Sequence, residues 1–412
     1  MRPGSHRVVI TGIGAVTPFG VGVEAFWEGL RSGRSAVRRL EGPEWEALPT
    51  RIGAVVPEFD AAAHMDARAA RRTARFGQFA VAAAREALRH AGLDLEREAE
   101  DAGVVLGTAG GLFASGYQEK LLEEKGPRRV DPLFVTRHGP HMAAARVARE
   151  LGLRGPNTTI NSACASGADA IGQALNLIRL GHAPVLLAGG SEAITHPVTI
   201  ASLGIVGALS QRNEEPERAS RPFDRDRDGF VLGEGAGVLV LESEEHARAR
   251  GARILAELAG AGWSFDATDD TAPDAEGQAL AMARALRDAG CRPEDVDWVK
   301  AHGTSTPLND RTETAAIKLV FGEHARRVPV SSMKSMIGHA ASASGAVEAV
   351  GAVLAMLHGT IPPTINYETP DPDCDLDYVP NAARPARLRT VLVNAFGLGG
   401  QNAALILRAY EP

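Results

Sequence analysis

The chain has 412 residues, a length that allows two or three ordinary domains or one large duplicated one. Hydrophobic residues make up 44%, charged residues 23%, and the formal net charge is −7. These values exclude a disordered chain, a collagen and a coiled coil. The mild acidity argues against a nucleic-acid binder, because a phosphate-binding surface is normally basic. No run approaches about 18 apolar residues, so we expect no membrane span.

The N-terminal residues show no feature of a secretory leader. They lead directly into an apolar run at Val8, without a signal core or a small-residue cleavage site. The three cysteines, Cys164, Cys291 and Cys374, are too few and too scattered for a disulfide framework or a zinc site, so we expect no metal. These features predict a cytoplasmic protein.

Short β-rich runs alternate with longer helical runs, which is the pattern of a layered α/β fold. No linker or low-complexity tract interrupts them, so we expect one compact body. The predicted strands are Arg7–Thr11, Ala102–Gly107, Val185–Ala188, Val238–Leu241, Trp298–Ala301, Val328–Ser331, Val391–Ala395 and Ala404–Leu407. The predicted helices are Thr73–Ala91, His141–Leu151, Ser166–Leu180, Glu276–Ala289, Asp310–Phe321 and Ala343–Leu357. Glycines that suit a left-handed C-cap follow five of them, namely Gly92, Gly152, Gly181, Gly290 and Gly322.

Two helical segments, residues 165–175 and 340–350, carry apolar and small residues on every side instead of a charged stripe. Such helices are buried between layers, and their small residues allow close approach. Each follows a residue able to do chemistry, Cys164 in the first case and His339 in the second. This repetition suggests two related halves.

A cysteine stands at the entrance of the first buried helix, in the segment Asn161–Gly167 (NSACASG). The preceding run Thr158–Ile160 is strand-like, so Cys164 lies where a strand meets a helix N-terminus. The helix dipole there lowers the pKa of a thiol and favours the nucleophilic thiolate. The alternative is a packed core cysteine, which is the more common role of a free cysteine.

Two histidines and a lysine could transfer protons or supply charge. His302 follows the strand-like run Val296–Lys300 and enters the loop HGTSTP, where an imidazole can point into a cleft or be a structural residue. Lys334, one of five lysines, lies five residues before His339. A buried lysine needs a partner, and Glu348 on the following helix is the nearest candidate in sequence.

A glycine-rich turn, Asn394–Asn402 (NAFGLGGQN), follows the predicted strand near the C-terminus. Backbone N–H groups in such a turn can stabilise an oxyanion. The turn lacks the strand–GxGxxG–helix context of a dinucleotide site.

In order and spacing, these motifs together resemble the β-ketoacyl-[acyl carrier protein] synthases, most closely the synthase II type and the ketosynthase subunits of type II polyketide systems. The resemblance spans nearly the whole chain and includes the segments Val8–Pro18, Arg221–Gly237 and Ile361–Thr364. It implies a dimeric acyltransferase with a thiolase-like α/β fold, a duplicated body of five αβαβα layers. Residues 1–250 would form the half with the nucleophile, and residues 251–412 the half with both histidines and the glycine-rich turn.

The resemblance further implies decarboxylative Claisen condensation of an acyl-enzyme thioester with malonyl-acyl carrier protein. Cys164 would accept the acyl group, while His302 and His339 would assist decarboxylation and stabilise the enolate. The backbone N–H groups of Cys164 and Leu398 would hold the tetrahedral oxyanion.

Other residues would support this centre. Lys334, paired with Glu348, would be a structural and electrostatic lysine. Thr304 and Thr306 would hold the phosphopantetheine arm, and Phe396 would be a further supporting residue. No resident cofactor is expected, because phosphopantetheine arrives on the carrier protein and loss of carbon dioxide supplies the carbanion.

Four positions depart from residues that are usual in the synthase II branch. Leu398 and Leu203 stand where phenylalanine is frequent, Gln401 where threonine or histidine is frequent, and Ala109 where a branched residue is expected. We hypothesise that Ala109, Leu203 and Leu398 line a roomier acyl pocket that suits long, stiff or polyunsaturated chains. The alternative is neutral drift with compensating repacking.

Basic residues fall where the family presents a surface to the acidic acyl carrier protein. We predict that Arg68, Arg72, Arg128 and Arg129 dock this partner, with salt-dependent steering. The alternative is an ordinary solvated face.

Several functional alternatives remain at this point. Condensation could serve fatty-acid elongation or a polyketide or polyene pathway, in a homodimer or in a heterodimer with a chain-length factor. A non-catalytic partner of the chain-length-factor type would lack the nucleophile, which is present here as Cys164. A cysteine acyl hydrolase would not need the pair of histidines, and a thiolase would need a second active-site cysteine.

Overall fold

The main sheet is one hydrogen-bonded path of strands that divides into two halves. The computed structural model describes residues 6–111 and 114–411. In order across the sheet, the strands are β11 (Val330–Ser331), β10 (Trp298–Lys300), β14 (Thr390–Phe396), β15 (Gln401–Arg408), β9 (Ala256–Phe265), β1 (Val8–Thr17), β8 (Gly235–Ser243), β7 (Val185–Glu192), β5 (Ala102–Gly107) and β6 (Asn157–Ile160). The C-terminal half meets the N-terminal half where β9 pairs with β1 through Glu257–Val9 and Ala256–Ile10.

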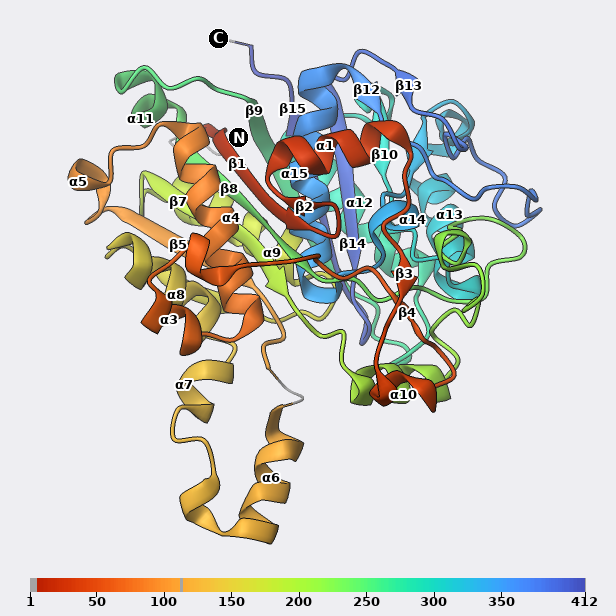
Figure 1. Cartoon of the computed structure of the whole chain (residues 1–412). Coiled ribbons are helices and arrows are strands. Elements are labelled where there is room, and N and C mark those ends of the chain that lie inside the picture. The colour runs from red at the N-terminus through yellow and green to blue at the C-terminus, as the bar shows by residue number, and fades with distance from the viewer. Residues whose placement is uncertain (1–5, 112–113, 412) are drawn as a thin grey trace.

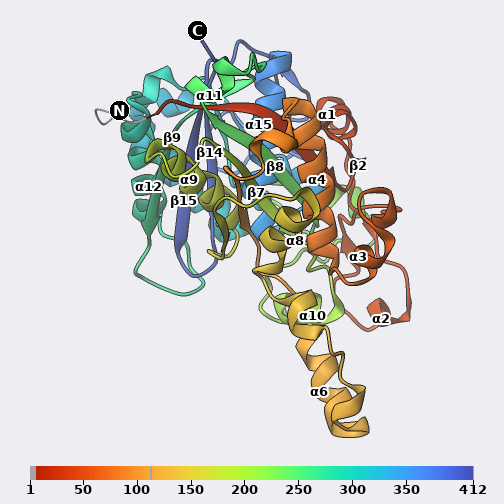
Figure 2. The same cartoon turned by 90° about the vertical axis from the view of Figure 1, so that its left-hand side faces the viewer.

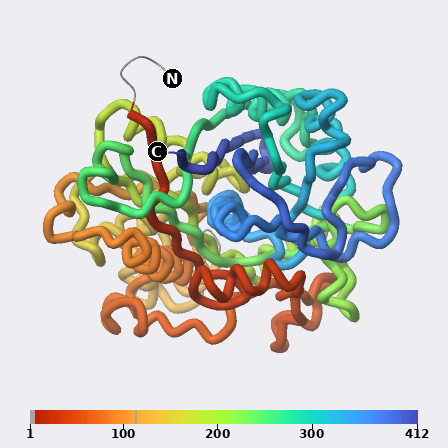
Figure 3. The backbone as a smooth tube through the Cα atoms, turned by 90° about the horizontal axis from the view of Figure 1, so that it is seen from above, coloured from red at the N-terminus to blue at the C-terminus, as the bar shows by residue number. Residues whose placement is uncertain are grey.

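The helices form three layers, one between the two halves of the sheet and one on each outer face (Figure 1). The central layer contains α9 (Ser166–Arg179) and α15 (Ser344–His358), while α4 (Arg75–Ala91) and α8 (Met142–Leu151) cover the N-terminal half, and α12 (Ala275–Ala289) and α13 (Pro307–Phe321) cover the C-terminal half. Seen from above, the halves lie side by side with α15 between them (Figure 3). The predicted αβαβα architecture is confirmed, while the boundary near residue 250 stays a prediction.

The two central helices cross at glycines. A Cβ atom on Gly167 would lie 2.8 Å from the backbone nitrogen of Ala346, and one on Gly345 would lie 2.8 Å from that of Ala168. Neither position can hold a side chain unless the backbone moves. The segment Ala341–His358 is long and apolar enough to span a membrane, but 78% of it is buried in the protein, as in a core helix.

Glycines also explain two differences between the predicted and the observed strands. β1 continues to Thr17 because Gly12 and Gly14 face the backbone of α4, where no side chain would fit. β9 is absent from the prediction, and its Gly260 and Gly262 face α12 in the same way. The outer helices α4 and α12 therefore pack directly on glycine-containing strands.

The predicted helix ends are mostly confirmed. Gly92, Gly152 and Gly290 are left-handed C-caps. Gly181 has a φ of 76° but lies one residue beyond the cap of α9. The prediction for Gly322 is wrong, because its ψ of −131° lies outside the left-handed helical region. The residue begins a short 3₁₀ turn instead.

A helical segment projects from the N-terminal half (Figures 1 and 2). It contains α6 (Ala114–Lys125), a 3₁₀ turn at Pro127–Arg129 and α7 (Phe134–His138). Large apolar side chains on it face solvent, with Tyr117 64% and Val135 69% exposed. This segment presents an apolar surface that the described chain leaves uncovered.

Candidate active site

Cys164 lies in a strained turn between β6 and α9. Ala163, directly before it, has a φ of 50°, a left-handed conformation that costs a residue with a side chain about 1 kcal/mol or more. The hydroxyl of Ser166 holds this turn, since it donates to the carbonyl oxygen of Ala163 at 2.6 Å and accepts from the N–H of Ser162 at 2.9 Å. The sequence therefore fixes Cys164 at the N-terminus of a buried helix, as predicted.

The prediction of a lowered thiol pKa is wrong on balance. Cys164 keeps some accessible surface, but protein surrounds its thiol, and burial raises the pKa above the ordinary value. The backbone N–H groups of Leu398 and Cys164 and the charge of Lys334 act in the opposite direction without overcoming burial. The resting group is a thiol, and the two N–H groups predicted to form an oxyanion hole both face its sulfur.

His302 and His339 are brought together from separate elements. His302 follows β10, and His339 follows α14 (Lys334–Ile337). Their rings lie edge to face with centroids 5.3 Å apart, and both residues are almost fully buried. Burial, followed by the positive charge of Lys334, holds the pKa of each imidazole well below its usual range. Both histidines are therefore neutral near pH 7.

Lys334 fixes the tautomer of His302. Its Nζ lies 2.6 Å from Oε1 of Glu348, 2.7 Å from the carbonyl oxygen of His302 and 3.4 Å from Nδ1 of His302. An ammonium group can only donate, so Nδ1 accepts and the imidazole proton lies on Nε2. The predicted pair of Lys334 and Glu348 is confirmed. Nδ1 of His339 lies 2.8 Å from the hydroxyl of Ser344, which can donate or accept.

Sequence reasoning missed a second buried lysine in this cluster. Lys300, the last residue of β10, is fully buried, and its Nζ makes a short contact with Oε2 of Glu348. The detectable signal is a lysine at the end of an apolar strand run, two residues before His302.

Two buried carboxylates, also missed, hold the loop that carries His302. Oε1 and Oε2 of Glu313 accept the N–H groups of His302 and Gly303, each at 2.7 Å. Oδ1 of Asp310 accepts the N–H of Thr304 at 3.0 Å. Both carboxylates lie on α13, so this outer helix positions the loop that carries His302.

The predicted supporting residues lie around the same loop. The hydroxyl groups of Thr304 and Thr306 are 2.9 Å apart, and the Thr306 hydroxyl also caps the N-terminus of α13. The ring centroid of Phe396 lies 5.7 Å from that of His302. Phe396 and Leu398 belong to one turn, which therefore contacts His302 at one end and Cys164 at the other.

The three predicted acyl-pocket residues are only partly brought together. The backbone N–H of Ala109 donates to the hydroxyl of Ser342 at 3.1 Å, and Leu203 of α10 (Pro197–Ile205) packs in a cluster with Ala341. Ala109 and Leu203 thus flank the turn that follows the second histidine. The side chain of Leu398 is 59% exposed and does not join them in the single chain.

Glu192, at the end of β7, is a fully buried carboxyl group beside this turn. Its Oε2 accepts the N–H of Ala109 at 2.9 Å and makes a short contact with the hydroxyl of Ser342, while Oε1 accepts the N–H of Ala193 at 3.1 Å. Burial raises its pKa to about 7, and these hydrogen bonds offset only part of the effect. Its negative charge also raises the pKa of the Cys164 thiol.

The arginines predicted to dock a carrier protein form two separate surfaces. Arg68 lies on α3 (Ala67–Arg71), Arg72 caps that helix, and both are exposed and line a pocket of about 500 Å³. Arg128 and Arg129 lie at the tip of the projecting segment, beyond α6 (Figure 1). The two pairs therefore lie on separate elements of the single chain, and their role in docking a carrier protein stays a prediction.

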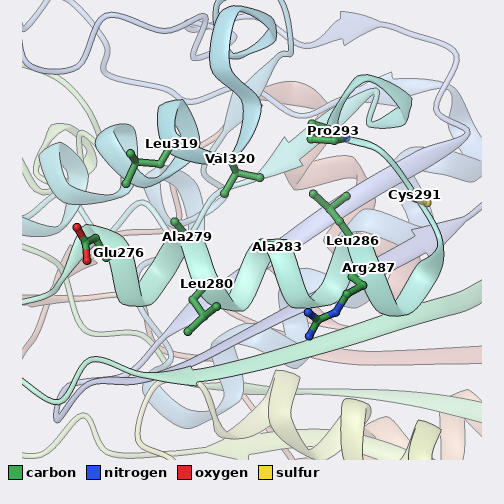
Figure 4. A pocket seen from close by; sticks show the side chains of 10 residues that line it. All are labelled: Glu276, Ala279, Leu280, Ala283, Leu286, Arg287, Cys291, Pro293, Leu319 and Val320. Carbon is green, nitrogen blue, oxygen red and sulfur yellow. The ribbon is translucent and has the colours of Figure 1, made fainter.

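A groove of about 690 Å³ between α12 and α13 lies apart from this centre (Figure 4). Leu280 and Leu319 line it together with the partly buried Cys291, and none of its lining residues is a predicted site residue. Among residues 6–111 and 114–411, no cluster of three or more metal-ligating side chains occurs.

Comparison with known proteins identifies the family. The model of the beta-ketoacyl synthase N-terminal domain matches residues 5–247, and that of the C-terminal domain matches residues 255–368. The chain is 45% identical over 409 residues to 3-oxoacyl-[acyl-carrier-protein] synthase 2 of Synechocystis sp., covering 98% of each chain. It is 46% identical over 418 residues to putative polyketide beta-ketoacyl synthase 1 of Streptomyces halstedii, covering 99% of each.

Solved structures agree with this assignment. The ishigamide ketosynthase/chain length factor superposes with a TM-score of 0.91 at 40% identity and covers 99% of this chain and 100% of its own. A type II polyketide ketosynthase in complex with its acyl-carrier protein superposes with a TM-score of 0.90 at 38% identity and covers 98% and 100%. The chain therefore belongs to the beta-ketoacyl synthase family and is an acyl-transferring condensing enzyme of fatty-acid or polyketide chain elongation.

Proposed function

We propose that Cys164, His302 and His339 act as one centre in the condensation. The observation that carries this proposal is the turn from Phe396 to Leu398. At one end it packs against the neutral His302, and at the other it directs a backbone N–H at the sulfur of Cys164. Nucleophile, proton-donating imidazoles and oxyanion donors thereby border one space.

In the first half-reaction, the sulfur of Cys164 attacks the acyl thioester carried by an acyl carrier protein. The new C–S bond forms as the old one breaks, and the carrier thiol leaves with the proton that Cys164 loses. The negative oxygen of the tetrahedral intermediate accepts the N–H groups of Cys164 and Leu398. Fixed donors in a buried site stabilise such charge without reorganisation.

In the second half-reaction, the malonyl C–C bond to the carboxylate breaks and carbon dioxide leaves. The electron pair forms an enolate, whose oxygen accepts the Nε2–H of His302 and a hydrogen bond from His339. The enolate carbon attacks the acyl group on Cys164, the C–S bond breaks, and the thiolate takes a proton from water, which balances the negative charge that the malonyl carboxylate brought in. Neutral imidazoles suit this role, because they donate hydrogen bonds without requiring a strong base.

The test separates the two half-reactions. Cys164→Ala should abolish the acyl-enzyme adduct in intact-mass measurement and abolish condensation, but should still release carbon dioxide from malonyl-acyl carrier protein. His302→Ala should keep the adduct and lose carbon dioxide release. Cys291→Ala is the matched control and should leave both unchanged. Condensation by the Cys164→Ala variant would overturn the proposal.

We propose that an acidic acyl carrier protein docks beside Arg68 and Arg72. These exposed arginines share their pocket with Arg146 and Arg149 of α8, so four arginines outnumber the two carboxylates there, Asp66 and Glu150. Such a surface steers an acidic partner in a salt-dependent manner. Arg68→Glu should raise the KM for the carrier substrate and make this KM less dependent on ionic strength. The variant Arg128→Glu, at the tip of the projecting segment, tests in the same assay whether the second pair of arginines contributes to docking.

We also propose that the chain works as a dimer, with either a second copy or a chain-length factor as partner. The apolar side chains of the projecting segment and the exposed residues of the edge strand β6 support this proposal. Light scattering of the chain alone, and after co-expression with a ketosynthase-like partner, tests it. A stable monomer in both samples would exclude a dimer.

We further propose a cytoplasmic enzyme without a resident cofactor. The reaction draws its carbanion from decarboxylation, and the phosphopantetheine arm enters with the carrier. We retain the roomier acyl pocket at Ala109, Leu203 and Leu398 as a hypothesis about chain selection.

A further inference from the structure

Lys300 places a second ammonium group inside the catalytic cluster. Its backbone lies in β10 between two parallel neighbours, paired with Ser331 of β11 on one side and Val393 of β14 on the other. The side chain is fully buried, and Nζ contacts Oε2 of Glu348 and lies 3.4 Å from the carbonyl oxygen of Asn394. A buried ammonium persists only where carboxylates and carbonyls replace its water.

The contacts of Glu348 show what the second ammonium does. Oε2 binds Lys300 and Oε1 binds Lys334, so the carboxylate is shared between two cations. The other nearby carboxylate, Glu313, is occupied by the N–H groups of the His302 loop and by the side-chain amide of Asn394 at 3.0 Å. Two lysines and two glutamates thus give a cluster with no net charge. Without Lys300, it would carry one uncompensated negative charge.

We propose that Lys300 is a positioning residue for the histidine pair: by holding one oxygen of Glu348, it leaves Lys334 in contact with His302 and balances the charge beside both imidazoles. This inference rests on the proposed roles of His302 and His339.

The charges that face the histidines support this role. Burial is the largest cause of the lowered pKa of both imidazoles, and the charges of Lys334 and Lys300 lower both pKa values further. The neighbouring His339 lowers the pKa of His302 as well, while Glu348 and Glu313 carry the negative charges that balance the two lysines. Removing Lys300 shifts the balance toward the negative groups, so the imidazoles protonate at a higher pH.

The experiment follows carbon dioxide release from malonyl-acyl carrier protein between pH 5 and pH 8. Lys300→Gln should move the acid limb of the rate profile to higher pH by roughly half a unit to one unit, because one buried charge is lost near the rings. Lys300→Arg should restore the wild-type position. Lys318→Gln is the matched control, since Lys318 pairs with Asp375 on the surface and should leave the profile unchanged.

A charge-balanced double variant separates electrostatics from folding. Lys300→Gln combined with Glu348→Gln removes one charge of each sign, so the acid limb should return toward its wild-type position even where the maximal rate is lower. Thermal unfolding confirms that each variant is folded. An acid limb that stays at the wild-type pH in folded Lys300→Gln overturns the inference. If Cys164→Ala still condenses, or the wild-type enzyme releases no carbon dioxide, the proposed function itself fails.

Discussion

Replacing Glu192 by glutamine tests the electrostatics beside the nucleophile. Burial raises the pKa of this carboxyl from 4.5 to about 7. Between these values the folded state binds more protons than the unfolded chain, so the free energy of unfolding falls as pH rises. The difference of about 2.5 units corresponds to roughly 3 kcal/mol, present below about pH 4.5 and lost by about pH 7.

The Glu192→Gln variant lacks this dependence. Urea unfolding of both proteins from pH 4.5 to pH 8 should show the wild type losing roughly 3 kcal/mol relative to the variant. The amide offers one oxygen where the carboxylate offers two, so the N–H of Ala109 or Ala193 loses an acceptor. That loss gives an offset of about 1 kcal/mol that does not vary with pH. If the two stability curves ran parallel, the assignment of a buried carboxyl of raised pKa would be wrong.

The same substitution has a second readout at the active site. Because the charge of Glu192 raises the pKa of the Cys164 thiol, the variant should react faster with iodoacetamide at pH 7 to 8. The rate is measured by mass spectrometry in a Cys291→Ala background, since Cys374 is buried. A rate equal to that of the background protein would place Glu192 too far from the thiol to matter.

Three further results are expected. Burial raises the pKa of Glu242, but hydrogen bonds, above all from Arg250, outweigh burial and lower the pKa to about 2. Glu242→Gln should therefore lower the free energy of unfolding by roughly 3 kcal/mol at pH 7. In denaturant titrations the variant should also lack the loss of stability that the wild type shows as pH falls from about 4.5 to 2. Gly345→Val should destabilise the fold by about 3 kcal/mol or more, because its side chain would meet the backbone at Ala168, and an unchanged Tm would contradict the crossing. Ala109→Ile should shorten the longest acyl chain accepted in a chain-length series, and unchanged preference would dismiss the roomier pocket.

Regular hydrophobic patterns made much of the fold predictable. The buried helix α15 is visible in the sequence because it lacks a polar face. The prediction of the same character for α9 is wrong on one side, where Asp169, Gln173 and Asn176 form a polar stripe that the described chain leaves partly exposed. Strand β9 is not visible in the sequence, because Gly260 and Gly262 interrupt its alternating pattern. Their role, to let α12 pack directly on the strand, is evident only in the structure. The order of motifs likewise indicated Cys164, His302, Lys334 and His339, but not the distances that join them.

The errors have a common physical origin in burial and spacing. A helix dipole predicts a lowered thiol pKa at Cys164, but the sequence does not show how completely protein surrounds the sulfur. Arg72 and Arg128 could be grouped by charge alone, whereas only the projecting helices show that they lie apart. Lys300 was missed because a lysine ending a strand is usually solvated, and its carboxylate partner lies 48 positions away along the chain.

The crossing of α9 and α15 limits how this enzyme can be recombined with its relatives. Cys164 precedes α9 and His339 precedes α15, so the approach of the two helices sets the distance between these two side chains. A chimaera joined near residue 250 would inherit Gly167 from one parent and Gly345 from the other. Only parents that both keep a glycine at this contact should yield an active hybrid.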